Sequence, residues 1–262
     1  MVRTIAFSLI VIFLNLSIAF PQAKMASDND FGVTLGLNEY QIRDEVLSDA
    51  RHRGFLASLG LSYSKLKEIS INELKFNLII NTLKSRYETE KASVAVNPSM
   101  NYSYLRKARD ISKNVNLYLG GIIGWNLHMD FYEEWDESHI YWLNSYFLGI
   151  SERLSYQKSD KSTINFDINI PVVALVSRPP ERFLYKELNP KFSWFISQFH
   201  DDLTLTSLHQ HFEFNMILEY KYGHPHKFKK SFFWSFSYIK NSMSYSKNVS
   251  ILTHTFGVSL LF

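Results

Sequence analysis

The sequence predicts an all-β protein, an antiparallel up-and-down β-barrel of about ten strands that crosses a membrane. The last strand alternates strictly, with Phe256, Val258, Leu260 and the terminal Phe262 on one face and small or polar residues on the other. The chain contains 21 phenylalanines and 15 tyrosines, yet its body has no long apolar run. This two-residue period is typical of a strand with one face in lipid and one in a polar lumen.

The N-terminus has the layout of a secretory signal peptide. Arg3 precedes an apolar stretch from Ile5 to Leu14, and the small-residue site Ser17-Ile18-Ala19 follows. The apolar stretch is short for a membrane-spanning helix, which needs about 20 residues. We expect residues 1–23 to be removed and residues 24–262 to form one barrel domain, with an uncleaved anchor as the alternative. Because the chain has no cysteine, disulfides and a lipoprotein acylation site are excluded.

Ten later segments repeat the alternating pattern. Each is long enough to cross a bilayer as a strand, which takes about 9–11 residues. The expected strands are 31–43, 53–65, 72–86, 92–105, 114–128, 139–154, 163–176, 207–221, 229–241 and 249–262.

The middle strands show the pattern best. In 163–176, isoleucines and a phenylalanine alternate with Asn165, Asp167 and Asn169. In 114–128 large apolar residues face asparagine and glycine, and 229–241 carries Phe232 and Trp234 on one face. A soluble sandwich can alternate as well, but it seldom places large hydrophobic residues on the same face of nearly every strand.

The terminal strand resembles the C-terminal strand of bacterial outer-membrane β-barrels, whose last residue is commonly phenylalanine. In such proteins this strand helps the assembly machinery to recognise the chain, which implies that role for Phe256, Val258, Leu260 and Phe262. The resemblance covers residues 31–262 and implies a location in the cell outer membrane of a Gram-negative bacterium. The implied partners are the lipid bilayer, lipopolysaccharide and the assembly machinery.

The segment 177–206 decides the strand count. It contains four aromatic residues that could form another strand, but their spacing is irregular and Pro179-Pro180 and Asn189-Pro190 are turn signals. Single-chain bacterial barrels have an even number of strands. We therefore expect ten strands with a long extracellular loop at 177–206, and twelve strands as the alternative. The connections 44–52, 87–91, 129–138 and 242–248 then also face outward.

The inward face of these strands carries charged residues of both signs. The expected lumen side chains are Lys75, Asp167, His209, His211, Glu213 and Glu219. Buried charges persist when they are paired, and the interior of a narrow barrel is filled by side chains, so no wide pore is expected. His209, His211 and Glu213 share one strand face, but nothing in their spacing is specific for a metal, and we predict neither a metal nor a cofactor.

Two outward connections carry the candidate binding residues. Segment 130–137 includes Asp130, Glu133, Glu134, Trp135, Asp136 and Glu137. These carboxylates could hold divalent cations that bridge lipopolysaccharide phosphates, or they could form a solvated rim. Segment 177–206 includes Arg178, Arg182, Trp194 and Phe195, and its apolar character favours a lid in the barrel mouth or a docking surface for a protein partner.

The leading functional hypothesis is a non-enzymatic barrel whose extracellular loops bind a partner, a surface ligand or lipopolysaccharide. The alternative is a lipid-modifying or proteolytic hydrolase at the extracellular rim, and the third is a narrow channel. The only candidates for catalysis are Ser207 with His209, or the segment His200-Asp201-Asp202. The spacing of Ser207 and His209 alone does not make them a catalytic pair. Enzymatic activity is therefore left open but not favoured. A net charge of +3 gives no indication of nucleic-acid binding.

Overall fold

The structure, a computed structural model, describes residues 29–262 except 46–47, 86–91, 133–138, 180–182, 185–196, 198, 201–202, 224–227 and 243–247. The expected signal peptide lies outside the described residues. The strands are β1 (Asn29–Asp44), β2 (Ser48–Lys67), β3 (Ser70–Ser85), β4 (Ala92–Ser112), β5 (Val115–Tyr132), β6 (His139–Ser159), β7 (Ser162–Ser177), β8 (Phe183–Leu184), β9 (Thr204–Ser207), β10 (His211–Gly223), β11 (Lys229–Asn241) and β12 (Val249–Leu261).

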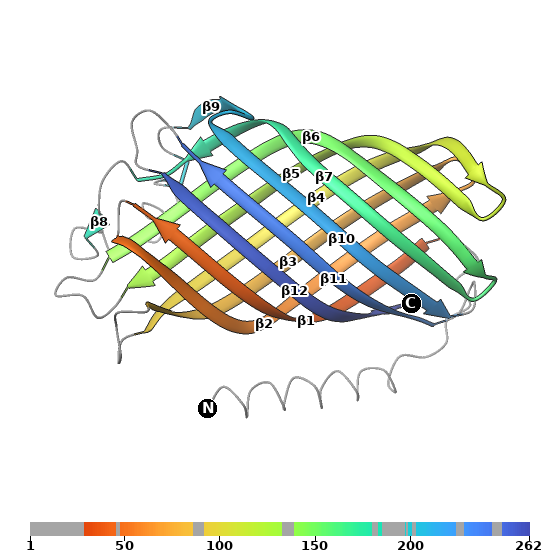
Figure 1. Ribbon diagram of the computed structural model, residues 1–262, viewed down its shortest axis with the longest axis horizontal. Coiled ribbons are helices and arrows are strands. Elements are labelled where there is room, and N and C mark those ends of the chain that lie inside the picture. The colour runs from red at the N-terminus through yellow and green to blue at the C-terminus, as the bar shows by residue number, and fades with distance from the viewer. Residues whose placement is uncertain are drawn as a thin grey trace.

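Ten of these strands close into a ring (Figure 1). Strands β1 to β7 pair in sequence order, β7 pairs with β10, and β12 pairs back with β1, in every case antiparallel. β8 has two residues and pairs with β6, and β9 has four and pairs with β7, so neither crosses the barrel. The prediction of ten crossing strands is confirmed, and the alternative of twelve is not.

The two ends of the barrel differ. Connections of two residues, 68–69, 113–114 and 160–161, lie at one end, where Phe31 and Phe262 exchange backbone hydrogen bonds of 3.1 and 2.8 Å. We call this the terminal end and the opposite one the loop end. Strand pairing runs further than expected here, because β4 continues to Ser112 whereas the expected strand was 92–105. In barrels with short periplasmic turns, the terminal end faces the periplasm.

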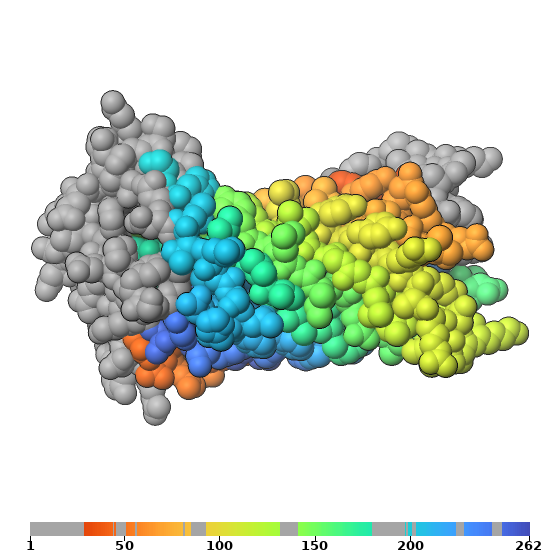
Figure 2. Space-filling model, turned by 90° about the horizontal axis from the view of Figure 1, so that it is seen from above, coloured from red at the N-terminus to blue at the C-terminus, as the bar shows by residue number. Residues whose placement is uncertain are grey.

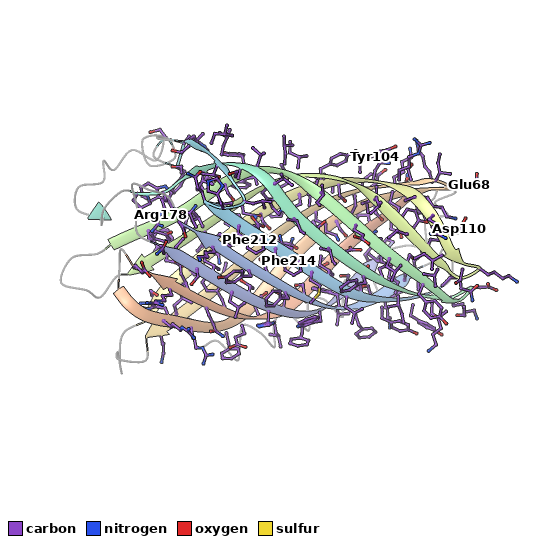
Figure 3. All side chains as sticks on the ribbon, turned by 45° about the horizontal axis from the view of Figure 1, so that its top comes forward. Glu68, Tyr104, Asp110, Arg178, Phe212 and Phe214 are labelled. Atoms are coloured by element: carbon purple, nitrogen blue, oxygen red, sulfur yellow. The ribbon has the colours of Figure 1, made fainter. Side chains whose placement is uncertain are left out.

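The outward face is a belt of exposed hydrophobic side chains. Leu37 is 66% exposed, Phe55 72% and Phe256 63%, and exposed apolar or aromatic side chains recur on the outward faces of the ring strands. Tyr104, on β4, projects from the outer surface (Figure 3), and the side chains form a continuous wall on the face seen in Figure 2. Only contact with lipid makes such a surface favourable. Within the described part of the chain, no helix has the length and apolar character needed to cross a membrane.

The predicted strand 207–221 is not continuous. A turn divides this part of the chain into the short strand β9 and the ring strand β10. β7 pairs with β10 up to Asn169 and with β9 from Val173 to Val176, while residues 208–210 form a turn between β9 and β10. Pro171 lies between the two stretches and has no N–H for a sheet hydrogen bond. The prediction that His209 faces the lumen is wrong, because this turn carries it to an exposed position.

Candidate functional site

A buried network of charges crosses the lumen near the terminal end. Arg153 of β6 donates from Nε to Asp167 Oδ1 and from Nη2 to Asp167 Oδ2, both at 2.6 Å. Its Nη2 also donates to Glu73 Oε2 of β3 at 2.8 Å, and Lys75 Nζ lies 2.8 Å from the same oxygen. Since β3 and β6 are three strands apart in the ring, these bonds cross the interior.

A second group of charges extends this layer. Ser231 Oγ donates to Glu219 Oε1 at 2.6 Å, and Lys221 Nζ lies 3.3 Å from Glu219 Oε2. Closer to the terminal end, Lys229 Nζ donates to Asp30 Oδ1 at 2.8 Å. The layer thus pairs acids with bases, as buried charges require. Lys75, Asp167 and Glu219 all face the lumen, as their alternation predicted.

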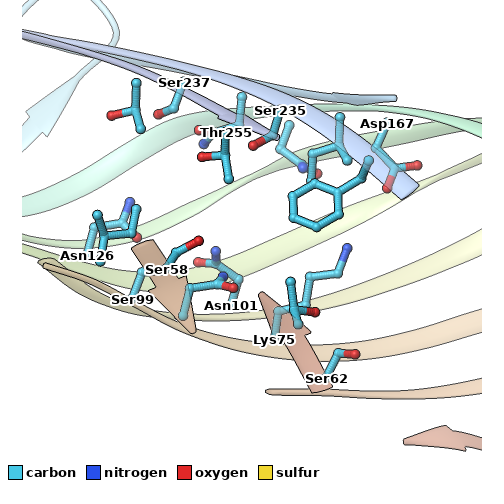
Figure 4. Close-up of a pocket in the computed structure, with 18 of the residues that line it drawn as sticks. Ser58, Ser62, Lys75, Ser99, Asn101, Asn126, Asp167, Ser235, Ser237 and Thr255 are labelled. Atoms are coloured by element: carbon cyan, nitrogen blue, oxygen red, sulfur yellow. The ribbon is translucent and has the colours of Figure 1, made fainter. Parts of the chain in front are cut away.

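A cavity of about 230 Å³ lies in the lumen beside this charged layer. Its lining is dominated by hydroxyl and amide side chains that enter from opposite walls, including Ser58, Ser99, Asn101, Asn126, Ser235 and Thr255 (Figure 4). Phe233 also lines it and is accommodated by Gly257 of the neighbouring strand, where a Cβ would collide with its ring. At about 30 Å³ per water molecule, this volume corresponds to a small cluster of waters.

Glu213 and His211 lie at the side of the cavity toward the loop end, both almost fully buried. Asn126 and Asn215 each donate an amide hydrogen to Glu213 Oε1 at 2.8 Å. His211 Nε2 is 3.8 Å from Glu213 Oε2, and its Nδ1 is 3.2 Å from Asn241 Nδ2. The side chains of both residues point into the lumen, as the alternation predicted. The described residues contain no cluster of three His, Asp or Glu side chains that could hold a metal ion.

The inner face becomes apolar toward the loop end, which the sequence analysis did not predict. A buried cluster there includes Tyr40, Ile42, Leu83, Tyr141, Leu143, Phe147, Val176, Ile239, Val249 and Ile251, from six strands of the ring. These residues occupy inward positions in the same alternation that places polar residues around the cavity. The guanidinium of Arg178 lies over the Tyr141 ring, 5.4 Å from its centroid, and the side chain is 2% exposed. The lumen is therefore filled by hydrophobic side chains on the loop side of the cavity.

Part of the long connection packs on the outside of the barrel. Phe199 is buried against Trp142 and Leu127, which lie on the outward faces of β6 and β5. The outward Asn144 bridges this contact, because its Nδ2 donates to the Phe199 backbone oxygen at 2.6 Å and its Oδ1 accepts from Trp125 at 2.7 Å. The expectation of a lid in the mouth is thus corrected for Phe199. Its aromatic surface is buried on the wall instead.

The other predicted loop residues are placed only in part. Eight of them lie outside the described residues: Glu133, Glu134, Trp135, Asp136, Glu137, Arg182, Trp194 and Phe195. Asp130 belongs to β5 and is fully buried, so neither it nor Arg178 presents a free surface. Phe256 and Val258 share the outward face of β12, whereas Leu260 is only 6% exposed. A role of that strand in assembly remains a prediction.

The structure brings together one pair considered for catalysis. Ser207 Oγ lies 2.7 Å from His209 Nδ1, at the end of β9 and in the exposed turn that follows. His200 lies apart from it, with its Nδ1 3.3 Å from Tyr146 Oη on the outer wall. Asp201 and Asp202 lie outside the described residues. No orienting side chain is bonded to the second ring nitrogen of His209 in the described part of the chain, so the pair lacks the third group of a triad.

Sequence reasoning missed Arg153, the residue that joins most of the network. A usable signal was present: in strand 139–154 and just beyond it, Ser151, Arg153 and Ser155 occupy one face and Ile150 and Leu154 the other. That alternation already places the arginine inside. Its partners were not predictable, because they depend on the register of strands far apart in the sequence.

No protein-family model matches the chain, and no curated protein sequence matches it. Among solved structures, the outer-membrane protease OmpT from Escherichia coli is similar with a TM-score of 0.52 and 9% identity, covering 90% of this chain and 98% of that one. The translocator domain of the autotransporter NalP from Neisseria meningitidis matches with a TM-score of 0.39, 8% identity and coverage of 99% and 98%. At such identities the likeness shows the fold alone, and it confirms the predicted outer-membrane β-barrel. A barrel of this fold with a lipid-facing belt belongs in the cell outer membrane.

Proposed function

We propose that this protein is a non-conducting outer-membrane barrel that acts as a scaffold and binds a partner or surface ligand through its loop end. The observation that supports the proposal is that buried side chains occupy the lumen on both sides of the cavity. The buried network around Arg153 fills the terminal side of the cavity, and the cluster around Tyr40 and Leu143 fills the loop side. A barrel that conducted ions or other polar solutes would need a continuous polar path between the two ends.

The rigid wall also supports a role for the outer connections. All ten strands of the ring are paired on both sides, and the described hairpins at the terminal end are too short to form a binding surface. Binding residues concentrate on loops that a rigid scaffold holds in place. At the loop end, the connections between β3 and β4, β5 and β6, β7 and β9, and β11 and β12 are all longer than these two-residue hairpins, and 178–203 is the longest of them.

We expect the reconstituted protein to give no passage of sugars. Apolar side chains and buried ion pairs leave no open lumen of the width that a porin has. Liposome swelling in isotonic sugars of several sizes measures this directly, with protein-free liposomes as the negative control and a general porin as the positive one. Swelling that depends on sugar size would contradict the closed lumen and favour the channel alternative.

We expect the binding activity to depend on the connections 133–138 and 178–203 and not on the wall. Deleting residues 133–136, or replacing both Trp194 and Phe195 by serine, should abolish adhesion of the protein to its partner or surface ligand. Assembly, measured as heat-modifiable migration in gels, should be unchanged. The matched control replaces exposed Lys113 and Asn114, in a two-residue hairpin at the terminal end, by serine. Loss of binding in this control would contradict a site at the loop end.

The hydrogen bond between Ser207 Oγ and His209 Nδ1 favours a hydrolase as the second candidate function. The similar structure of OmpT is described as a protease, but likeness of fold does not carry activity to this chain. The pair lies on the outer surface, where a lipid or peptide could reach it. Hydrolysis of phospholipid, lipid A or a peptide by the purified protein, lost in both Ser207→Ala and His209→Ala, would replace the non-enzymatic proposal.

A further inference from the structure

Five cations gather on the outward face near the loop end. They are Arg43 of β1, Arg51 and Arg53 of β2, Lys84 of β3 and Lys240 of β11, and every one is exposed. Their strands are adjacent in the ring, with β12 between β11 and β1. Lys240 and Arg43 both pair with Ser250 of β12, which places them at one level on either side of it. We call these five residues the basic patch.

The register of the basic patch places like charges directly opposite each other. Arg43 is the cross-strand partner of Arg51, and Arg53 is the partner of Lys84. Side chains in such positions have Cβ atoms about 4.5–5.5 Å apart, and like charges there destabilise a sheet. Two such pairs on one face are an unfavourable arrangement unless an anion lies between them.

Carboxylates of the chain neutralise the patch only in part. Glu39 approaches Arg53 at 3.9 Å and Glu45 approaches Arg43 at 3.9 Å, both at long range for an ion pair. Glu39 also accepts a hydrogen bond from Gln41 at 2.9 Å. Among the described side chains, five cations thus face two carboxylates. On these described residues the basic patch carries a net positive charge, which favours an anionic ligand.

The position of the basic patch along the barrel axis indicates which anion it would bind. On β1 the last strongly exposed apolar residue is Leu37, and on β2 it is Phe55, so the cations begin directly beyond the lipid-facing belt. The opposite wall differs, because outward positions of β5 and β6 at this level carry no described cation, are mostly apolar or aromatic and are partly covered by Phe199. The patch therefore lies on one side of the barrel, at the level of the headgroups of the outer leaflet.

We propose that the basic patch binds the phosphate groups of lipopolysaccharide, the phosphorylated glycolipid of the outer leaflet. The arginines present planar forks that bond two oxygens of a phosphate at once, and a lipid in this leaflet places its acyl chains on the belt just below. The site lies on the wall, so it is independent of the partner-binding loops proposed above. It also differs from the acidic segment 130–137, which would reach phosphates only through bridging cations.

The test measures the affinity of the purified full barrel, in zwitterionic detergent, for fluorescently labelled short-chain lipopolysaccharide. The triple variant Arg43→Gln, Arg51→Gln, Arg53→Gln should bind it at least about tenfold more weakly, because each cation near an anionic surface contributes measurably to binding. The matched control is Lys65→Gln, Lys67→Gln, Arg106→Gln, which removes three exposed outward cations at the terminal end. The control should bind as the unchanged protein does.

Removing the lipid A phosphates from the probe should weaken binding to the unchanged protein by a similar factor and leave the triple variant unaffected. Equal binding of the dephosphorylated probe, or equal loss in the terminal-end control, would overturn the proposal. So would equally tight binding of phosphatidylglycerol, or displacement of the probe by an equal concentration of inorganic phosphate. Heat-modifiable migration of each variant confirms that it is folded, and the loop variants described above should bind the probe normally.

Discussion

Replacing Arg153 by alanine should destabilise the folded barrel by about 3–5 kcal/mol, the cost of breaking a buried ion pair by removing one partner. The guanidinium is bonded to Asp167 through two nitrogens and to Glu73 through one of them, and all three side chains are less than 10% exposed. Its loss leaves two buried carboxylates, of which only Glu73 keeps a cation, Lys75, at 2.8 Å. Urea unfolding in lipid or detergent, followed by tryptophan fluorescence, measures the change.

Two further variants separate charge from packing. Arg109→Ala removes an exposed arginine of β4 and should change the stability by no more than about 0.5 kcal/mol. The triple variant Arg153→Met, Glu73→Gln, Asp167→Asn removes these three charges together and should recover part of the loss, because no buried carboxylate is left without its arginine. If Arg153→Ala alone costs as little as Arg109→Ala, the ion pairs of Arg153 do not stabilise the barrel in the way we describe.

The wall of the barrel could be predicted from the sequence almost completely. The alternation of apolar and polar residues follows directly from the contact of one face with lipid and the other with the lumen, so it appears within each strand without knowledge of its partners. The even strand count then followed from the irregular aromatics and prolines of 177–206. Strand ends were less accurate, because hairpin pairing continues beyond the membrane, as in β4 to Ser112.

The interior and the outer connections could not be predicted to the same degree. Alternation places a residue inside, but it does not reveal what it meets across the lumen, so the apolar filling around Tyr40 and Leu143 was missed. His209 was misplaced because a turn interrupts the strand after Ser207. Phe199 was expected in the mouth, yet the outward Trp142 and Leu127 offer it an apolar surface on the wall. Each case depends on contacts between segments far apart in the chain.

Replacing Val258 by arginine should destabilise the barrel by about 2–4 kcal/mol, the cost of a cation on the lipid face near the bilayer midplane. Val258 lies outward on β12 with Leu35 and Phe232 as its cross-strand partners. On β1, Leu35 lies between Phe31 and Leu37, two exposed residues of the lipid-facing belt. An arginine at the height of Leu35 therefore lies within the belt, with apolar surface on both sides of it.

The same unfolding experiment checks this result, in bilayers and again in short-chain detergent. The loss should be smaller in the detergent, whose thinner apolar layer lets the guanidinium reach water. Val258→Leu is the matched control, because it keeps the site apolar and should cost less than about 1.5 kcal/mol. An arginine tolerated as well as leucine would mean that this face of β12 does not contact lipid, and the orientation of the whole terminal strand would have to be reversed.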